Sequence, residues 1–182
     1  MLQGLLLVAA AVAQTAETAG LPVAAPPAGA SSVVAGQLHV DGAPFFPVGM
    51  YVHSLASADW DWMQESGINT VLTYTNGLVG GEKALESNIT EAKLAQMGSF
   101  LDAAAARSIK VFFSLKDLYD THNKGADNAG IVAKIVTKFR NHKALLGWYL
   151  NDEYKPYYIP QLQARYANVS ALDPNHVRKR SF

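Results

Sequence analysis

The sequence contains no cysteine, and it has no excess of charge of either sign. Without cysteine, disulfide bridges, zinc–thiolate sites and cysteine nucleophiles are excluded. Fifteen Lys and Arg residues balance fifteen Asp and Glu residues, whereas a nucleic-acid-binding domain usually carries a basic patch or stripe. The basic cluster, 178–180, lies at the end of the chain, and we interpret it as a frayed tail. We therefore expect no nucleic-acid partner.

The sequence also lacks an apolar run long enough to span a bilayer, which takes about 20 residues. Its most apolar stretch, 5–13, is shorter and ends in Ala11-Val12-Ala13, a small-x-small pattern suited to signal peptidase. We predict a signal peptide over 1–13 and a secreted, extracellular protein without a membrane span. The triplets that begin at Asn88 and Asn168 are N-glycosylation sequons, which agrees with secretion.

The chain is predicted to divide into a tail and one domain. Residues 14–36 are rich in Ala, Pro, Gly, Ser and Thr, which is typical of a flexible segment. From 37 to 182, strand and helix patterns follow one another without another such interruption. Apolar residues make up 49% of the chain and charged residues 16%, a composition typical of a globular protein.

The folded part is predicted to begin with a β-hairpin and to continue with four strand–helix units. Asp41-Gly42 separates the first two strands as a two-residue turn, because glycine tolerates the positive φ that such a turn requires. The later strands are expected at 68–74, 110–115 and 144–150. Helices are expected over 58–66, from Asn88 as N-cap, around 131–139, and from Pro160 until Pro174 ends the last one.

This alternation implies a parallel sheet with right-handed crossovers. Two architectures fit, an open doubly wound sheet and a (β/α)8 barrel. The sequence has no G-x-G-x-x-G motif after its first strand, and that absence counts mildly against the doubly wound sheet. A complete barrel typically takes about 250 residues. The 182 residues therefore predict a partial (β/α)8 barrel of about four βα units preceded by a β-hairpin.

Ligands of parallel α/β proteins bind at the carboxyl ends of the strands. Aromatic and polar residues follow each predicted strand here, and we take as candidate binding residues Tyr51, His53, Tyr74, Asn76, Asp117, Trp148, Asn151 and Asp152. Aromatic faces stack on sugar rings, while amides and carboxylates bond to hydroxyl groups. We therefore expect a carbohydrate ligand. In the alternative interpretation, these residues are polar because the chain turns toward water there.

Glu153 is the candidate catalytic residue. It ends the run Asn151-Asp152-Glu153, which follows seven mostly apolar residues and is flanked by aromatic ones. A glutamate beside aromatic surface is partly desolvated, which raises its pKa and suits a general acid near neutral pH. Alternatively, Asp152 or Glu153 caps the next helix.

The segment from Gly147 to Glu153, read Gly-Trp-Tyr-Leu-Asn-Asp-Glu, resembles the fourth strand of clan A glycoside hydrolases. These are retaining (β/α)8 enzymes that include β-galactosidases and β-mannanases. The stretch 38–51 likewise resembles their opening hairpin and first strand. The resemblance extends over about 37–155 and implies that Glu153 is the acid/base. Asp152 departs from this resemblance, because the family usually has an Asn at this position, which holds the sugar 2-hydroxyl.

The resemblance also implies a retaining mechanism, which needs a second carboxylate as nucleophile. In the family this carboxylate comes from strand seven, whereas the predicted strands end near the start of strand five. We therefore expect the 182-residue chain to be inactive as a glycosidase. It is expected to be an enzyme only if a longer chain supplies the second carboxylate. The alternatives are a non-catalytic carbohydrate-binding protein and a non-functional half-barrel. We expect no metal and no cofactor, and we expect self-association through open sheet edges.

Overall fold

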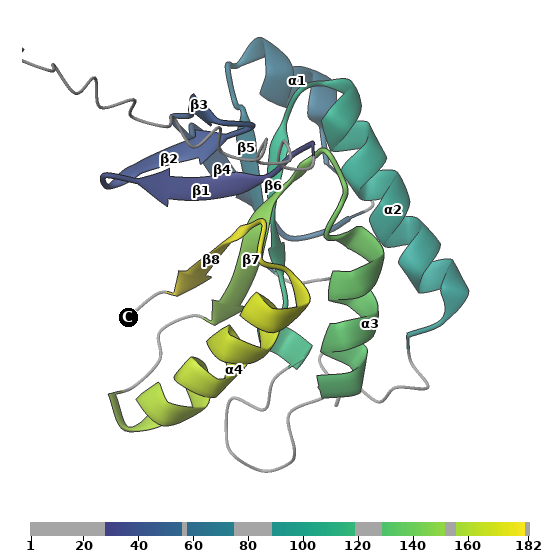
Figure 1. Ribbon diagram of the computed structural model, residues 1–182. Helices are drawn as coiled ribbons and strands as arrows, with labels where there is room; N and C mark the ends of the chain where they lie inside the picture. The colour runs from purple at the N-terminus through teal and green to yellow at the C-terminus, as the bar shows by residue number, and fades with distance from the viewer. Residues whose placement is uncertain (1–27, 56–57, 75–88, 119–128, 152–155, 181–182) are drawn as a thin grey trace, which may run out of the picture.

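The computed structural model describes residues 28–55, 58–74, 89–118, 129–151 and 156–180. Two sheets and four α-helices make up this part of the chain (Figure 1). One sheet is a small antiparallel unit near the N-terminus, and the other is a five-stranded sheet. The signal peptide expected over 1–13 lies outside the described residues.

The antiparallel unit consists of β1 (Ser31–Val34), β2 (Gln37–Val40) and β3 (Ala43–Pro44), in that order. The predicted turn at Asp41-Gly42 is confirmed, with φ of 52° and 80°. The flexible tail predicted over 14–36 is wrong at its end, because β1 pairs with β2 along its whole length. The hairpin therefore has one strand more than the sequence pattern indicated.

The larger sheet is parallel throughout and contains β4 (Gly49–Val52), β5 (Thr70–Thr73), β6 (Lys110–Ser114), β7 (Leu145–Asn151) and β8 (Val177–Arg180). The strands lie side by side in sequence order. A doubly wound sheet reverses its strand order at a switch point. The described strands do not reverse, so their topology is that of a partial barrel.

The fifth parallel strand corrects two expectations. The sequence pattern indicated four core strands, and the basic cluster 178–180 was interpreted as a frayed tail. Instead these residues belong to β8, which pairs with β7 from Val177 to Arg180. Backbone hydrogen bonding makes this strand, so it needs no apolar side-chain pattern of its own.

The helices are α1 (Trp60–Glu65), α2 (Glu91–Ala106), α3 (Ala129–Phe139) and α4 (Ile159–Leu172), with short 3-10 turns at Lys116–Leu118 and Pro156–Tyr158. The four predicted helices are thus confirmed, but the predicted cap of α2 is wrong. Thr90, not Asn88, is its N-cap and accepts a hydrogen bond from the backbone of Lys93. None of the described helices is both long and apolar enough to cross a membrane.

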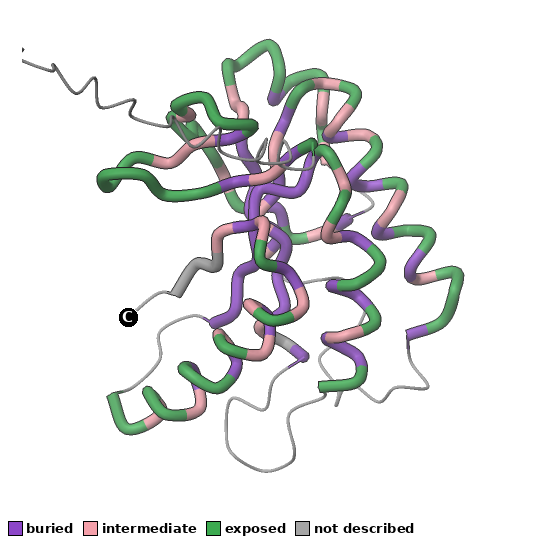
Figure 2. Tube along the Cα trace, in the orientation of Figure 1, coloured by how far each residue is buried: buried purple, intermediate pink, exposed green. Residues whose placement is uncertain are grey.

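The main core lies between the parallel sheet and the helices (Figure 2). Strand residues alternate between the two faces of a sheet. On β6, for example, Val111, Phe113 and Leu115 belong to this core, whereas Phe112 and Ser114 do not. The second group therefore faces the concave side, which is the side away from the helices and the interior of the barrel.

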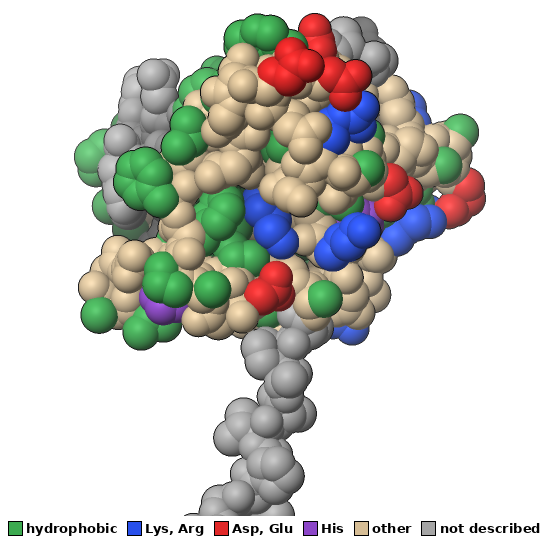
Figure 3. Space-filling model, turned by 90° about the horizontal axis from the view of Figure 1, so that it is seen from above, with side chains coloured by type: hydrophobic (Ala, Val, Ile, Leu, Met, Phe, Trp, Pro, Cys, Tyr) green, Lys and Arg blue, Asp and Glu red, His purple; other side chains and the backbone are tan. Residues whose placement is uncertain are grey.

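The hairpin is fixed at the end of the sheet where β7 and β8 begin (Figure 1). The backbone N–H of Ser31 donates to the carbonyl of Asn175 at 2.8 Å, and its hydroxyl donates to the carbonyl of Leu146. Val177 in turn donates its N–H to the Ser31 hydroxyl at 3.0 Å. Seen from this end, acidic and basic side chains intermingle on the surface (Figure 3). The opposite end, where the strands finish, is the one at which ligands are expected.

Candidate functional site

Tyr74 is the centre of a cluster at the carboxyl ends of β4, β5 and β6. The ring of Tyr51 meets the Tyr74 ring edge-on, with centroids 5.7 Å apart and an interplanar angle of 86°. The His53 ring lies 5.4 Å from it. The ammonium of Lys116 lies 3.7 Å from the centroid of the Tyr74 ring, which is a cation–π contact. Three candidates predicted separately from the sequence therefore lie together.

The positions of these side chains follow from strand alternation. Val52 is in the helix-side core, so Tyr51 and His53, its neighbours in sequence, face the concave side. Lys116 begins the 3-10 turn just after β6, and its contact with the Tyr74 ring places its ammonium in the cluster. Just below the cluster, Ser114 donates its backbone N–H to the hydroxyl of Thr73 at 2.8 Å, which joins the ends of β5 and β6.

Asn151 lies at the carboxyl end of β7 and is 0% exposed. Trp148 and Leu150 belong to the helix-side core, which places Asn151 on the concave side. The pairing of β7 with β8 shifts register between Tyr149 and Asn151. Such irregularities occur often beside active sites, where they redirect a side chain. The structure thus places Asn151 at the same edge of the sheet as the Tyr74 cluster.

A pocket of about 260 Å³ adjoins this cluster between β4 and α1. Its lining includes Tyr51, His53, Asp59 and Trp62. The two aromatic side chains are well exposed, Tyr51 by 50% and Trp62 by 51%. Asp59 is the N-cap of α1, and its carboxylate accepts from the N–H of Trp62 at 3.1 Å. The pocket therefore presents ring faces and a carboxylate to solvent, groups that suit a sugar.

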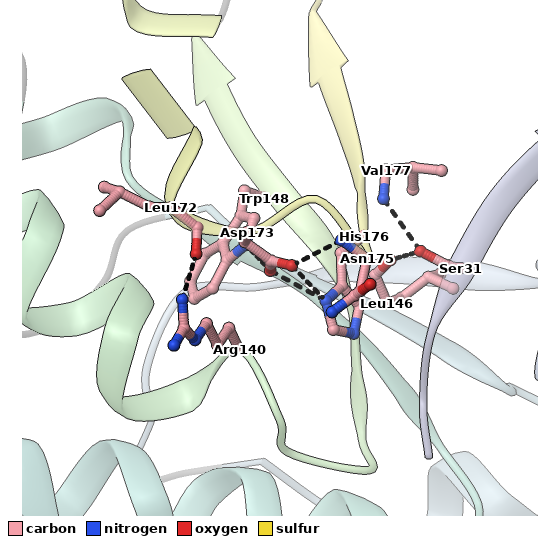
Figure 4. A network of polar contacts seen from close by, with 9 residues as sticks. All are labelled: Ser31, Arg140, Leu146, Trp148, Leu172, Asp173, Asn175, His176 and Val177. Carbon is pink, nitrogen blue, oxygen red and sulfur yellow. Dashed lines mark hydrogen bonds and ion pairs between the residues drawn. The ribbon is translucent and has the colours of Figure 1, made fainter. Parts of the chain in front are cut away.

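Trp148 does not belong to this site, although its place beside the Asn-Asp-Glu run predicted that it would. It is 0% exposed and points to the helix side of β7, where its indole N–H donates to Asp173 at 2.7 Å (Figure 4). Asp173 also accepts from His176, at 2.9 Å and 3.0 Å from its two oxygens. The prediction failed because alternation along the strand, not closeness in sequence, decides which side a residue faces.

The same network perturbs the titration of Asp173. Burial raises the pKa of this carboxyl, but hydrogen bonds from His176 and Trp148 favour the charged form more strongly, and the net effect is a lowered pKa. Both the Asp173 and the His176 side chains are fully buried. This pair connects the end of α4 to β7 and has no access to a ligand.

Most of the remaining candidates lie outside the described residues. These are Asn76, Asn88, Asp152 and Glu153, together with the side chain of Asp117. Asn168 lies within α4 and is half-buried. Its sequon partner Ser170 donates its hydroxyl to the carbonyl of Tyr166 at 2.6 Å.

Within the described part of the chain, no group of three or more His, Asp or Glu side chains could hold a metal ion.

The parallel strands in sequence order, the hairpin at their amino ends and the aromatic cluster at their carboxyl ends define a class of fold. It is part of a (β/α)8 barrel, a fold that the chain shares with solved glycoside hydrolases. No protein-family model matches the chain, and no curated protein matches it in sequence.

Particular solved structures show the likeness. The β-mannanase of the blue mussel Mytilus edulis is 16% identical, with a TM-score of 0.60 over 85% of this chain and 63% of the mannanase. An endo-1,4-β-mannanase from Rhizomucor miehei is 14% identical, with a TM-score of 0.61 over 81% of this chain and 59% of that one. An endocellulase from Pyrococcus horikoshii, in complex with cellotetraose, is 13% identical. Its TM-score is 0.59 over 84% of this chain and 57% of the endocellulase. The chain thus spans about 60% of the length of these structures, and identities this low show a shared fold.

Proposed function

We propose that this chain is the part of a retaining glycoside hydrolase that binds the glycan and carries the general acid/base, Glu153. The observation that carries the proposal is the joint position of the Tyr74 cluster and Asn151. They lie at one edge of the parallel sheet, on its concave side. Glu153 follows Asn151 by two positions in the sequence. The structural neighbours are enzymes that act on mannan and cellulose, as their names state.

In this mechanism, Glu153 donates a proton to the leaving oxygen of an O-glycosidic bond and later takes one from water. A second carboxylate, about 5–5.5 Å from the first, attacks the sugar carbon. We propose that this nucleophile comes from a strand beyond the five that the structure describes. On this proposal the 182-residue chain binds a glycan but does not complete hydrolysis by itself.

Asp152 is proposed to take the place of the Asn that usually accepts from the sugar 2-hydroxyl. A carboxylate can accept the same hydrogen bond. It also places a negative charge next to Glu153, and a like charge raises the pKa of a neighbouring carboxyl. A raised pKa suits the acid role, because the carboxyl then still carries its proton near neutral pH.

A carbohydrate-binding protein without catalysis is the second candidate function. The half-exposed rings of Tyr51 and Trp62 beside the pocket favour it. Ring faces of this kind bind sugars whether or not a nucleophile is present. The two candidates share a binding site and differ only in turnover.

Two variants separate them. Glu153→Gln removes the acid/base with little change in size, and Glu65→Gln, on the exposed end of α1, is the matched control. Release of nitrophenol from aryl glycosides by the natural secreted protein reports turnover, and calorimetry with mannotetraose reports binding. The catalytic proposal predicts turnover that only Glu153→Gln abolishes, with binding kept. Binding without turnover by the natural protein would favour the second candidate.

We also propose that the protein is secreted after loss of residues 1–13 and is glycosylated at Asn88 and Asn168. The Ala-Val-Ala pattern and the sequons support this proposal. N-terminal sequencing of the secreted protein, and its mass before and after removal of N-glycans, test it. An N-terminus at Met1, or a mass that does not change, would contradict it.

A further inference from the structure

We propose that Lys116 makes the concave edge of the sheet selective for glycans that carry a negatively charged sugar. This inference rests on the proposed glycan site and adds the class of substrate to it. Neutral hexoses offer hydroxyl groups, which amides and rings bind without a cation. A carboxylate or sulfate on the sugar needs a positive group, and Lys116 is placed to supply it.

The first support is the position of the ammonium group. Lys116 lies just beyond β6, two residues after Ser114, and its Nζ is 3.7 Å from the centroid of the Tyr74 ring. A lysine side chain is otherwise flexible and strongly hydrated. Contact with the ring face holds the charge over the aromatic cluster, at the edge where the strands end.

The second support is the chemistry of the groups around it. Tyr74 also contacts the rings of Tyr51 and His53. Two phenol groups, an imidazole and an ammonium can all donate hydrogen bonds, and an ammonium has three N–H donors to share between acceptors. Stacking rings with several donors suit an anionic sugar, because the ring holds the pyranose face while the donors hold its charged group.

The third support is the acidic pair Asp152-Glu153, which follows Asn151 in the sequence and includes the proposed acid/base. An anionic sugar close to a carboxyl pair is repelled unless a cation compensates. In the cluster that the structure describes at this edge, Lys116 is the cationic side chain whose place is set by a ring contact. Its charge therefore offsets the cost of bringing a second negative group to the edge.

The experiment compares two tetrasaccharides that differ only at C6, β-1,4-mannotetraose and β-1,4-tetramannuronate, bound to the full chain by calorimetry. The expected result is roughly tenfold tighter binding of the uronate, which is the effect of one charge-assisted hydrogen bond. A 6-O-sulfated mannotetraose is the third ligand, and its affinity decides whether a carboxylate or a sulfate ester is the preferred anion.

Lys116→Met keeps the length of the side chain and removes its charge, and should abolish the preference for anionic ligands while mannotetraose still binds. Lys116→Arg should keep most of the preference. Lys143→Met removes the same charge just before the amino end of β7, and should leave the preference unchanged. Thermal unfolding of each variant identifies any that fails to fold.

Two results would overturn the inference, and only the second would also overturn the proposed function. Equal affinities for the tetrasaccharides, or a preference that survives in Lys116→Met, would refute the role of Lys116 and leave the proposed glycan site standing. If neither the neutral nor the anionic tetrasaccharides bind, both the inference and the proposed function fail.

Discussion

The indole N–H of Trp148 donates a hydrogen bond of 2.7 Å to Oδ2 of Asp173, and both side chains are fully buried. Asp173 lies just after α4, so the bond joins the middle of β7 to the segment that leads into β8. It also explains why a tryptophan next to the candidate catalytic run is absent from the site. The indole N–H of Trp148 is already hydrogen-bonded to Asp173 on the helix side of the sheet.

Trp148→Phe should destabilise the fold by about 1–3 kcal/mol, because it leaves a buried carboxylate without one of its donors. Denaturant unfolding followed by circular dichroism measures the change. Trp62→Phe is the control, since Trp62 is half exposed and should change stability by less than about 0.5 kcal/mol. Equal effects of the two variants would show that the bond contributes nothing specific.

Stability should fall in acid because of Asp173. Its pKa is lowered in the folded state, while the unfolded chain has the usual value. The carboxylate therefore contributes its full stabilisation above the unfolded pKa of 3.8, and this is lost as pH drops through the lower folded pKa. Free energies of unfolding between about pH 2 and pH 7 measure the loss. Asp173→Asn should flatten this part of the profile, and an unchanged slope would contradict the assignment.

Gly147 is required by the close pairing of β7 and β8. A Cβ at this position would collide with the carbonyl oxygen of Val177 and lie 2.8 Å from Cε1 of Phe112. Gly147→Ala should therefore destabilise the fold by about 1–3 kcal/mol.

Gly98→Ala is the matched control for this change. It lies within α2, where the new methyl would meet one ring atom of Phe139 at an ordinary 3.7 Å. Alanine is favoured over glycine in a helix by about 0.5–1 kcal/mol, so Gly98→Ala should be neutral or stabilising. Thermal unfolding compares the two, and a tolerated Gly147→Ala would show that the two strands can move apart.

Thr90→Ala should cost about 1 kcal/mol, because it removes the side-chain oxygen that caps α2. Thr90→Ser keeps this oxygen and should be close to neutral. Both can be measured by denaturant unfolding of protein without glycans, since Thr90 also completes the sequon of Asn88. If the serine variant were as unstable as the alanine variant, the lost methyl group and not the cap would be responsible.

The central strands could be predicted because their residues carry the signal themselves. β5, β6 and β7 are mostly β-branched, aromatic or aliphatic and largely buried. The predicted ranges contain β5 and β6, whereas the predicted 144–150 stops one residue before β7 ends at Asn151. Asp41-Gly42 was recognised as a turn because glycine tolerates a positive φ, and Gly42 adopts a φ of 80°. In these places local chemistry and the final fold agree.

The misses came from elements that depend on partners far away in the sequence. β1 has little apolar pattern and forms because it pairs with β2 and is fixed by Asn175 and Val177. β8 is basic and forms because β7 offers a backbone edge. At the site, the sequence indicated Tyr51, His53 and Tyr74 but not their contacts, which depend on the spacing of adjacent strands. Neither could it show that Lys116 lies over a ring.

The carboxyl ends of β4 to β7 are proposed to form the glycan site. Protein-observed NMR of the full chain during titration with mannotetraose tests this site most directly. The predicted result is that signals of Tyr51, His53, Tyr74 and Asn151 shift together with a single affinity, while those of Ser31 and His176 at the hairpin end do not move. Shifts confined to the hairpin end, or none at saturating ligand, would contradict the claim.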